Sequence, residues 1–276
     1  MRTLVSGLGM VESVRWWSGR VWFADWTAGT IHAVTPEGSD EVVWRHESLP
    51  LCFDRHPDGP TLVVSNAAQA VLRADDDGRL RPWADLAGLA AGAWNEIVLT
   101  APGAGYVDCG NFDPARGFPD PADEDGLVVL VGEGAEPRVV ARGLLFPNGL
   151  ALTTDRATLL VAESHASRIS AFPIADDGAL GERRDWAVTP GYAPDGLAMA
   201  PDGSCWFADV AGACLVRVTD GGRVLDRVDL GRAAFSCALD DTGRTLYAAV
   251  ADWPADGAFA DPAHVWDGAV VAVEVG

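Results

Sequence analysis

The chain has 276 residues, of which 49% are hydrophobic, so it is long enough to bury a large core. Its 40 acidic and 20 basic residues give a net charge of −20. A surface of that charge repels nucleic acid phosphates and anionic lipids, so we expect neither a nucleic acid nor a membrane as a partner. The sequence contains no lysine, which excludes a Schiff-base lysine.

The amino-terminal residues 1–7 lack the apolar stretch of a secretory signal. No other run approaches the roughly 20 apolar residues of a membrane span. We therefore expect a soluble, cytoplasmic protein. No pattern indicates an oligomeric state.

Six short apolar runs recur along the chain, and 276 residues divided by six gives 46 per unit. This period suits the four short strands of a propeller blade and is too short for a βαβ unit. In three units a further apolar run follows at once. The sequence thus predicts an all-β, six-bladed β-propeller with four antiparallel strands per blade, in a single domain over residues 1–276. The six runs are 21–24, 62–64, 106–107, 159–162, 206–208 and 246–250, and the three that follow are 30–34, 168–172 and 215–218.

Clusters of Asp and Gly separate the runs, as tight turns between strands require. No stretch has sustained helical spacing, although residues 83–93 could form one short helical turn. An insertion at residues 113–125 is rich in Pro, Asp and Gly. We expect an exposed loop there, and a candidate lid over the mouth of the ring.

Four short turns place a single oxygen-bearing residue just before an apolar run, at Glu12, Asn95, Asn148 and Asp195. If the units are equivalent blades, these side chains converge on the axis of the ring. Converging carboxylate and amide oxygens are how proteins hold a hard divalent cation.

Two of these turns, Pro147-Asn148-Gly149 and Pro194-Asp195-Gly196, are also ordinary turn formers. The chain supplies its own contrast. Pro57-Asp58-Gly59 and Pro201-Asp202-Gly203 follow the first strand of their units, where only a tight turn is needed. Asn148 and Asp195 precede that strand, which favours the ligand interpretation.

Familiar catalytic motifs are missing, since the sequence has no GxSxG elbow, no P-loop and no HExxH. The five histidines have no spacing that indicates metal ligands. We single out His165 as a candidate site residue, because it follows the second strand of the unit that carries Asn148 and should lie on the same face of the ring. The five cysteines form no CxxC pair, and we expect buried thiols at Cys52, Cys109, Cys205, Cys214 and Cys237.

Several segments, 9–16, 21–25, 146–151, 194–198 and 235–238, together resemble the gluconolactonase, senescence marker protein 30 and luciferin-regenerating enzyme family. The resemblance covers nearly the whole chain. Its most specific part is the pair Pro-Asn-Gly-Leu-Ala and Pro-Asp-Gly-Leu-Ala, one blade apart. The resemblance implies a six-bladed propeller with one divalent metal held by Glu12, Asn148 and Asp195, with Asn95 contacting the substrate.

The neighbouring units can be compared by counting back from the turn that follows the first strand. Asn95, Asn148 and Asp195 each stand eight residues before the turn position, and the same count gives Leu51 in the second unit and Phe235 in the sixth. We expect both to contact an apolar part of the substrate. Glu12 stands seven residues before Gly19, so the first unit is expected to be one residue out of register.

Three protein ligands leave positions on a cation open for water and for a substrate oxygen. We expect a lactone or ester hydrolase in which the metal polarises the carbonyl and Asp195 is the base towards a metal-held water. Calcium is the first choice of metal. Zinc, magnesium, manganese and iron also fit, because the donor set selects hard cations without choosing among them.

Some positions depart from the family pattern. Members that act on sugar lactones commonly carry an Arg two residues before the substrate Asn, whereas this chain has Ala93, and Glu96 follows Asn95 in place of Asp. These departures favour a substrate less polar than gluconolactone, as do five tryptophans in or beside loops, Trp16, Trp17, Trp26, Trp94 and Trp253.

Two alternatives remain open. One is another reaction on the same metal site, such as hydrolysis of a phosphotriester or an activated ester, or a biosynthetic cyclisation or isomerisation, because fold and ligands do not separate these. The other is a non-catalytic propeller used for binding.

Overall fold

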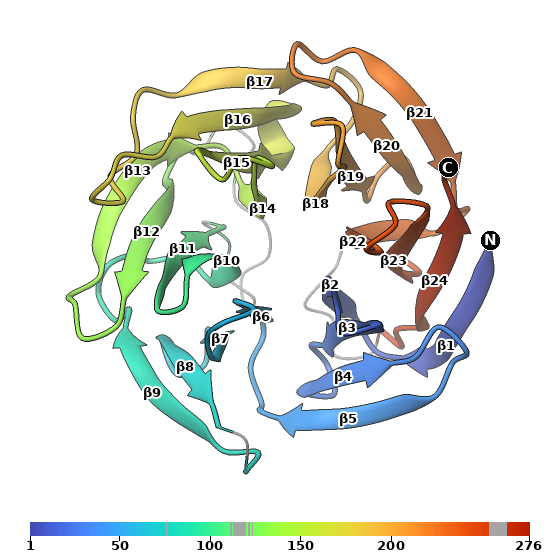
Figure 1. The fold of residues 1–276 in the computed structure, drawn as a ribbon, viewed down its shortest axis with the longest axis horizontal. Coiled ribbons are helices and arrows are strands. Elements are labelled where there is room, and N and C mark those ends of the chain that lie inside the picture. Colours follow the sequence, from blue (N-terminus) through green and yellow to red (C-terminus); the bar gives the residue numbers. More distant parts are fainter. Residues whose placement is uncertain (76, 111, 113–119, 121, 123, 254–263) are drawn as a thin grey trace.

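The fold is described by a computed structural model over residues 1–75, 77–110, 112, 120, 122, 124–253 and 264–276. Six four-stranded antiparallel sheets stand around a common axis as the blades of a propeller (Figure 1). The prediction of an all-β, six-bladed ring is confirmed.

Blades 1 to 5 are simple meanders from the axis outward, and blade 6 takes its outermost strand from the start of the chain. Blade 1 has β2 (Val11–Trp17), β3 (Arg20–Asp25), β4 (Thr30–Val34) and β5 (Asp40–Arg45). Blade 2 has β6 (Leu51–Arg55), β7 (Thr61–Ser65), β8 (Ala70–Ala74) and β9 (Leu80–Asp85). Blade 3 has β10 (Trp94–Ala101), β11 (Ala104–Cys109), β12 (Gly126–Gly132) and β13 (Arg138–Leu144).

The second half of the ring repeats this order. Blade 4 has β14 (Pro147–Leu152), β15 (Thr158–Glu163), β16 (Arg168–Pro173) and β17 (Arg184–Val188). Blade 5 has β18 (Pro194–Met199), β19 (Cys205–Asp209), β20 (Cys214–Val218) and β21 (Val224–Asp229). Blade 6 has β22 (Ala233–Leu239), β23 (Thr245–Ala251), β24 (Gly268–Glu274) and, from the other end of the chain, β1 (Arg2–Leu8).

The first strand of the chain completes the last blade. β1 pairs antiparallel with β24, with Arg2 opposite Ala272 and Thr3 opposite Val271. The two chain ends consequently lie at the same edge of the ring (Figure 1). The ring is thus held closed by backbone hydrogen bonds.

Burial follows position within a blade. Strands near the axis are covered by neighbouring blades on both faces, so β7 is buried at every residue, whereas the outermost strand β21 is exposed at nearly every one. This explains why the second strand of every unit, and the third strand of three units, stood out as apolar runs. All five cysteines are buried thiols, as predicted.

The predicted apolar runs all fall inside strands, from 21–24 in β3 to 246–250 in β23. The helical turn predicted at 83–93 is wrong, because those residues form the end of β9 and turns. Among the described residues the one helix is the short 3-10 turn η1 (Ser164–Ala166), and no helix there is long and apolar enough to cross a membrane. In the predicted loop, residues 113–119, 121 and 123 lie outside the described residues.

Candidate metal centre and substrate cavity

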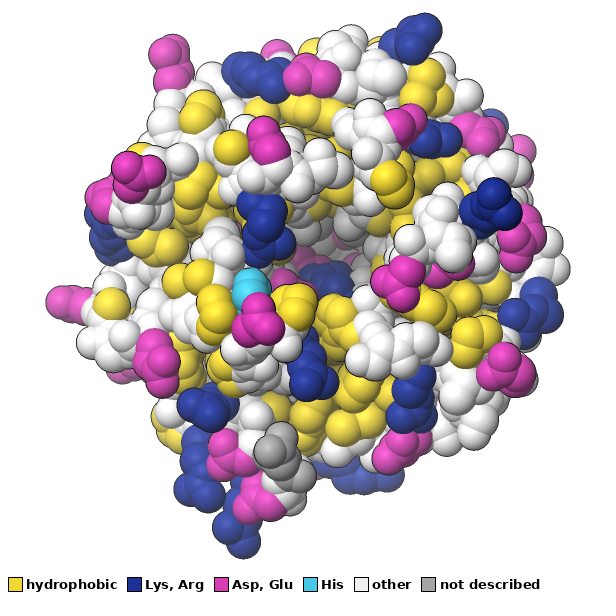
Figure 2. All heavy atoms as spheres, in the orientation of Figure 1, with side chains coloured by type: hydrophobic (Ala, Val, Ile, Leu, Met, Phe, Trp, Pro, Cys, Tyr) yellow, Lys and Arg dark blue, Asp and Glu magenta, His cyan; other side chains and the backbone are white. Residues whose placement is uncertain are grey.

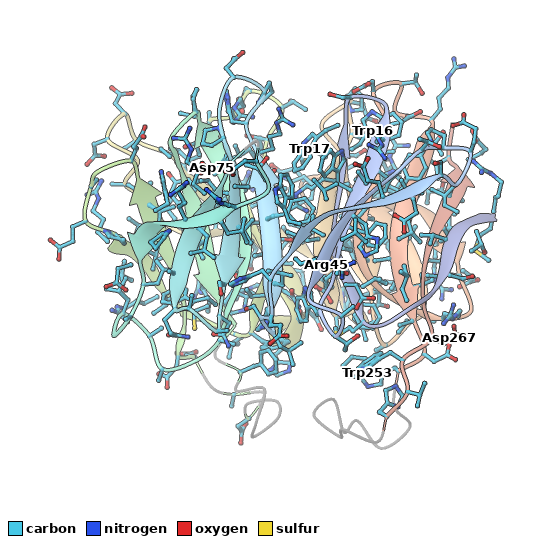
Figure 3. All side chains as sticks on the ribbon, turned by 90° about the horizontal axis from the view of Figure 1, so that it is seen from below. Trp16, Trp17, Arg45, Asp75, Trp253 and Asp267 are labelled. Atoms are coloured by element: carbon cyan, nitrogen blue, oxygen red, sulfur yellow. The ribbon has the colours of Figure 1, made fainter. Side chains whose placement is uncertain are left out.

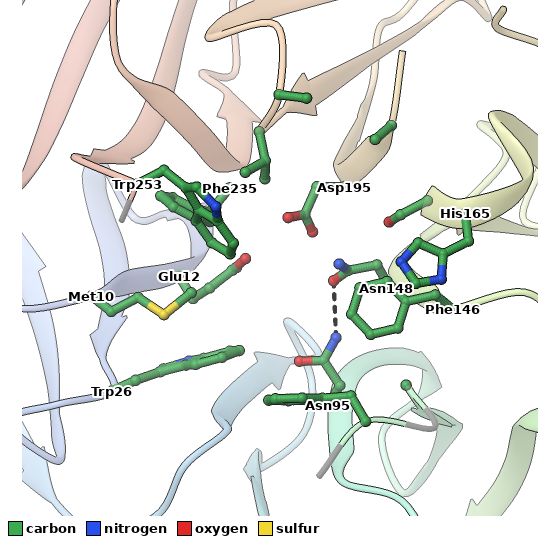
Figure 4. Close-up of a pocket in the computed structure, with 16 residues that line it drawn as sticks. Met10, Glu12, Trp26, Asn95, Phe146, Asn148, His165, Asp195, Phe235 and Trp253 are labelled. Atoms are coloured by element: carbon green, nitrogen blue, oxygen red, sulfur yellow. Dashed lines mark hydrogen bonds between the residues drawn. The ribbon is translucent and has the colours of Figure 1, made fainter. Parts of the chain in front are cut away.

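A cavity of about 330 Å³ lies at the end of the ring where the inner strands begin (Figure 4). Four of its lining residues are those predicted to converge, Glu12, Asn95, Asn148 and Asp195. Ser164 and His165 add further polar groups. The rest of the wall is mainly apolar, with Met10, Trp26, Phe112, Phe146, Phe235 and Trp253 as its large side chains.

The same backbone irregularity sets the polar residues at the axis in three blades. Each inner strand there first pairs regularly with the second strand and then places two residues opposite one residue of its partner, which is a β-bulge. The regular pairs are Trp94 with Cys109, Pro147 with Glu163 and Pro194 with Asp209. Asn95, Asn148 and Asp195 follow directly on these pairs, and so each reaches the cavity at the same level.

Gly149 and Gly196, which directly follow Asn148 and Asp195, let neighbouring inner strands approach closely. A Cβ atom added to Gly196 would stand 2.6 Å from Ser236 Cα, and one added to Gly149 would collide with the backbone oxygen of Asp195. The Pro-Asn-Gly and Pro-Asp-Gly segments therefore serve close strand packing at the axis and are not simple turns here.

Glu12 has the same place relative to the end of the second strand as the other three residues. Val11 pairs with Asp25 at the end of β3, as Pro147 does with Glu163, and Glu12 follows it. Glu12 itself still pairs with Ala24, however, and the bulge of β2 begins one residue later than in the other three blades. The predicted shift of one residue in the first unit is therefore present in the position of its bulge. The count differs from that of blade 3, although both turns have two residues, because β10 contains a second bulge between Leu99 and Ala101 that β2 lacks.

The count selected the wrong residue in blade 2. β6 has no bulge, so Leu51 pairs with Ser65 and the residue that follows this pair is Cys52. Leu51 is fully buried and does not line the cavity, whereas Cys52 Sγ lies 3.8 Å from Asn95 Oδ1. In blade 6 the counted residue, Phe235, does line the cavity.

A hydrogen bond joins two of the amides across blades 3 and 4. Asn95 Nδ2 donates to Asn148 Oδ1 at 2.9 Å (Figure 4). The bond orients both side chains, and it leaves a second N–H of Asn95 and a second lone pair of Asn148 for other partners.

The two carboxylates in the cavity are buried, each with 5% of its surface exposed. Burial, together with the charge of Glu96, raises the pKa of Glu12 to about 8. Burial and the charge of Glu12 raise the pKa of Asp195 well above its usual value. Glu12 Oε2 accepts a hydrogen bond from the backbone N–H of Ser13 at 2.6 Å, but Asp195 Oδ1 has no partner among the described residues.

Such a pair of buried, mutually repelling carboxylates with an unpartnered oxygen fits a cation, which would satisfy the oxygen and offset the charge. The amide oxygen of Asn148 completes a donor set of hard ligands. Among the described residues no three His, Cys, Asp or Glu side chains are grouped for a metal, so any site here depends on the Asn148 amide.

Charged groups below the cavity were not predicted. Arg15 Nη2 donates to Glu96 Oε1 at 2.7 Å, and Arg15 Nε lies 3.5 Å from Asp54 Oδ1. The backbone N–H of Glu96 donates to Asp108 Oδ1 at 2.7 Å. Burial raises the pKa of Asp54, Glu96 and Asp108. The signal in the sequence was a charged residue inside an apolar strand, as in Tyr106-Val107-Asp108-Cys109.

Ser13 links this network to Glu12. It has a positive φ of 57°, which is strained for a residue other than glycine. Its hydroxyl donates to Glu96 Oε1 at 3.3 Å and accepts from the backbone N–H of Phe53 at 3.3 Å. The backbone that carries Glu12 is thus tied to blades 2 and 3.

The tryptophans divide between the two ends of the ring. Trp26 and Trp253 line the cavity, whereas Trp94 is fully buried in the core. Trp16 and Trp17 line a second hollow of about 420 Å³ with Arg15 and Asp54, and they lie at the edge of the ring opposite Trp253 (Figure 3). Figure 2 views the ring from that opposite side, where basic and acidic side chains lie within the central hollow.

His165 lies in the cavity wall, as its place after the second strand of blade 4 predicted. Its ring stacks on Phe146, with centroids 4.6 Å apart and planes 21° from parallel. Burial lowers the pKa of His165, which favours the neutral form of its ring.

Comparisons with solved structures give the same fold. A gluconolactonase from Xanthomonas campestris matches with a TM-score of 0.75 at 23% identity, covering 98% of this chain and 89% of that one. A luciferin-regenerating enzyme matches with a TM-score of 0.81 at 16% identity, covering 100% and 95%.

Sequence comparisons reach two curated relatives. One is a 6-deoxy-6-sulfogluconolactonase from Pseudomonas putida, 28% identical over 87% of each chain. The other is a pentonolactonase from Haloferax volcanii, 26% identical over 76% of this chain and 69% of that one. The sequence profile of the SMP-30/Gluconolactonase/LRE-like region matches residues 10–252, so the resemblance seen in the motifs is confirmed and the chain belongs to that family.

Proposed function

We propose that this protein, an enzyme of the gluconolactonase-like hydrolase class, opens a lactone ring with the help of one divalent cation. The observation that supports this most strongly is the convergence of Glu12, Asn148 and Asp195 from three blades on one cavity, with Asn95 beside them. Both curated relatives are named as lactonases.

Glu12, Asn148 and Asp195 are the residues proposed to hold the cation, with calcium as the first choice. A cation bound there supplies a Lewis acid for a carbonyl oxygen. Asn95 is proposed to contact the substrate, because its hydrogen bond to Asn148 fixes the amide and leaves one N–H to donate to a lactone oxygen.

Asp195 is proposed as the catalytic base. Its carboxylate takes a proton from a water molecule beside it, and the water oxygen attacks the carbonyl carbon of the lactone. The ring C–O bond then breaks, and the proton passes to the ring oxygen, which becomes the hydroxyl of a hydroxy acid. A strained ring ester requires less activation than an amide, so lactones suit this set of groups better than peptides do.

The test is a panel of γ- and δ-lactones assayed with chelator and after adding back calcium, zinc, magnesium, manganese or iron. We expect turnover that the chelator abolishes and that at least one cation restores. Glu12→Gln should lose the response to the cation, and the matched variant Glu41→Gln, on the exposed strand β5, should keep it. Absence of hydrolysis with every cation, or hydrolysis that the chelator does not affect, would show the proposal to be wrong.

A further inference from the structure

The charge of the cavity is the first indication of what it binds. Among the described lining residues the charged side chains are Glu12 and Asp195, both acidic and both assigned above to the cation. No described lining residue is an Arg, and the sequence has no Lys. The described part of the cavity wall therefore offers no fixed positive charge to an anionic substrate.

Two sets of aromatic side chains face each other across the polar residues (Figure 4). On one side, Phe235 and Trp253 have ring centroids 5.8 Å apart, and Trp26 lies on the same side of the cavity beyond Met10. On the other, Phe146 stacks on His165 and meets Phe112 edge to face at 6.2 Å. The polar groups occupy the floor between these two walls.

The described parts of the two walls have few polar atoms for the hydroxyls of a sugar. Ser164 Oγ already donates to the backbone oxygen of Pro194 at 2.8 Å. The ring nitrogens Trp26 Nε1 and His165 Nδ1 have no partner among the described residues, but both are covered by surrounding protein atoms. A polyhydroxylated ring would exchange water for apolar surface here, which is unfavourable for each hydroxyl left unpaired.

We propose that the cavity selects uncharged lactones that carry an apolar substituent, with the lactone carbonyl over the polar floor and the substituent between the two aromatic walls. This inference rests on the proposed lactonase function and names its substrate class. The volume of about 330 Å³ lies in the range of small-molecule sites.

The expected selectivity follows from burial of the substituent. Each methylene moved from water into an apolar wall changes affinity by about fourfold. A δ-lactone with a five-carbon side chain should therefore exceed unsubstituted δ-valerolactone in kcat/KM by roughly 100-fold or more. Glucono-δ-lactone should fall below both, and a lactone bearing a sulfonate or carboxylate should be the poorest substrate.

The experiment compares these four lactones with the cation-loaded enzyme, and it adds a binding arm with the matching δ-lactams, which are resistant to hydrolysis, followed by tryptophan fluorescence. If glucono-δ-lactone or the anionic lactone is the best substrate, the inference is overturned while the lactonase function stands. If no lactone is hydrolysed but the alkyl lactam binds more tightly than δ-valerolactam, the lactonase function is overturned and the cavity assignment stands. Equal binding of both lactams overturns the inference.

Wall variants locate the selectivity. Trp253→Ala and Phe146→Ala should each raise KM for the alkyl lactone about 10-fold and change that for δ-valerolactone less than about twofold. Trp253→Phe should restore most of the loss. Trp44→Ala, which removes a partly buried tryptophan of β5 outside the cavity, is the matched control and should change neither KM. An equal rise in both KM values for the cavity variants would contradict the assignment.

Discussion

The tripeptide Pro-Asp-Gly occurs twice within ten residues of blade 5, at Pro194-Asp195-Gly196 and at Pro201-Asp202-Gly203, and the two copies have opposite environments. Asp202 is exposed, accepts from the backbone N–H of Ser204 at 3.1 Å and pairs with Arg217 at 2.9 Å. Asp195 is buried, and its Oδ1 has no partner among the described residues.

The difference arises from the place of each copy on the strand. Pro194 begins β18 and pairs with Asp209, so the bulge that follows directs Asp195 to the axis. Pro201 lies in the turn between β18 and β19, where the backbone N–H of Gly203 donates to the oxygen of Ala200 at 3.0 Å. Identical residues thus form an ordinary turn at one end of a strand and a candidate ligand at the other, because only one end faces the cavity.

The largest expected effect comes from making the same substitution in both copies. Asp195→Asn should lower kcat/KM at least ~100-fold, the lower range for loss of a general base, whereas Asp202→Asn should change it less than about twofold. Both changes keep the shape of the side chain. Steady-state kinetics with a circular dichroism control for folding measure the contrast, and unchanged turnover in Asp195→Asn would refute its role.

The glycines of the two copies should differ in stability. Gly196→Ala places a Cβ against Ser236 Cα and the backbone oxygen of Phe235, and overpacking against backbone should cost about 3 kcal/mol. Gly203→Ala meets no atom within 4 Å, and its φ of +84° should cost about 1 kcal/mol. Urea unfolding measures the loss of stability in both variants. Equal losses would mean that the strands at the axis can move apart to accommodate the added Cβ.

Calcium should stabilise the protein through Asp195 and not through Asp202. At 100 times its dissociation constant, a ligand that binds only the folded state adds about 2.7 kcal/mol, which raises the melting temperature by several degrees. We expect this rise in the wild type and in Asp202→Asn, and its loss in Asp195→Asn. A thermal melt with and without chelator measures it, and an unaltered rise in Asp195→Asn would place the cation elsewhere.

The pKa values of Asp195 and Asp202 should also be shifted in opposite directions in protein treated with a chelator. Hydrogen bonds from Ser204 lower the pKa of Asp202, and burial raises that of Asp195. A lowered pKa adds stability above the unfolded value near 4, which is lost as the pH falls through the folded pKa. A raised pKa adds stability at low pH, which is lost as the pH rises through the folded pKa. Carboxyl carbon NMR of the two residues checks the order, and coincident titrations would contradict it.

The repeat, the blade number and the four oxygen-bearing residues could be predicted from the sequence, because apolar runs and turn residues recur with the period of a blade. The register of Glu12 could not be predicted, nor could the fact that Cys52 takes the place assigned to Leu51. Both depend on whether an inner strand contains a bulge and on the length of the following turn, and backbone pairing determines these features.

The buried network of Arg15, Asp54, Glu96 and Asp108 was missed for a different reason. Charged residues inside strands read as solvent-facing positions, and partners come from blades far apart in sequence, with Arg15 and Glu96 separated by 81 residues. Only the folded ring shows that they meet.

The closure of the ring by β1 and β24 has a consequence for biosynthesis. Blade 6 stands between blades 5 and 1, which supply Asp195 and Glu12, and its sheet is complete only when the last strand has joined the first. A nascent chain that has not yet released β24 from the ribosome therefore has an open seam beside the cavity. We expect the proposed cation to bind only after β24 has joined β1, because its proposed ligands Asp195 and Glu12 lie on either side of this seam.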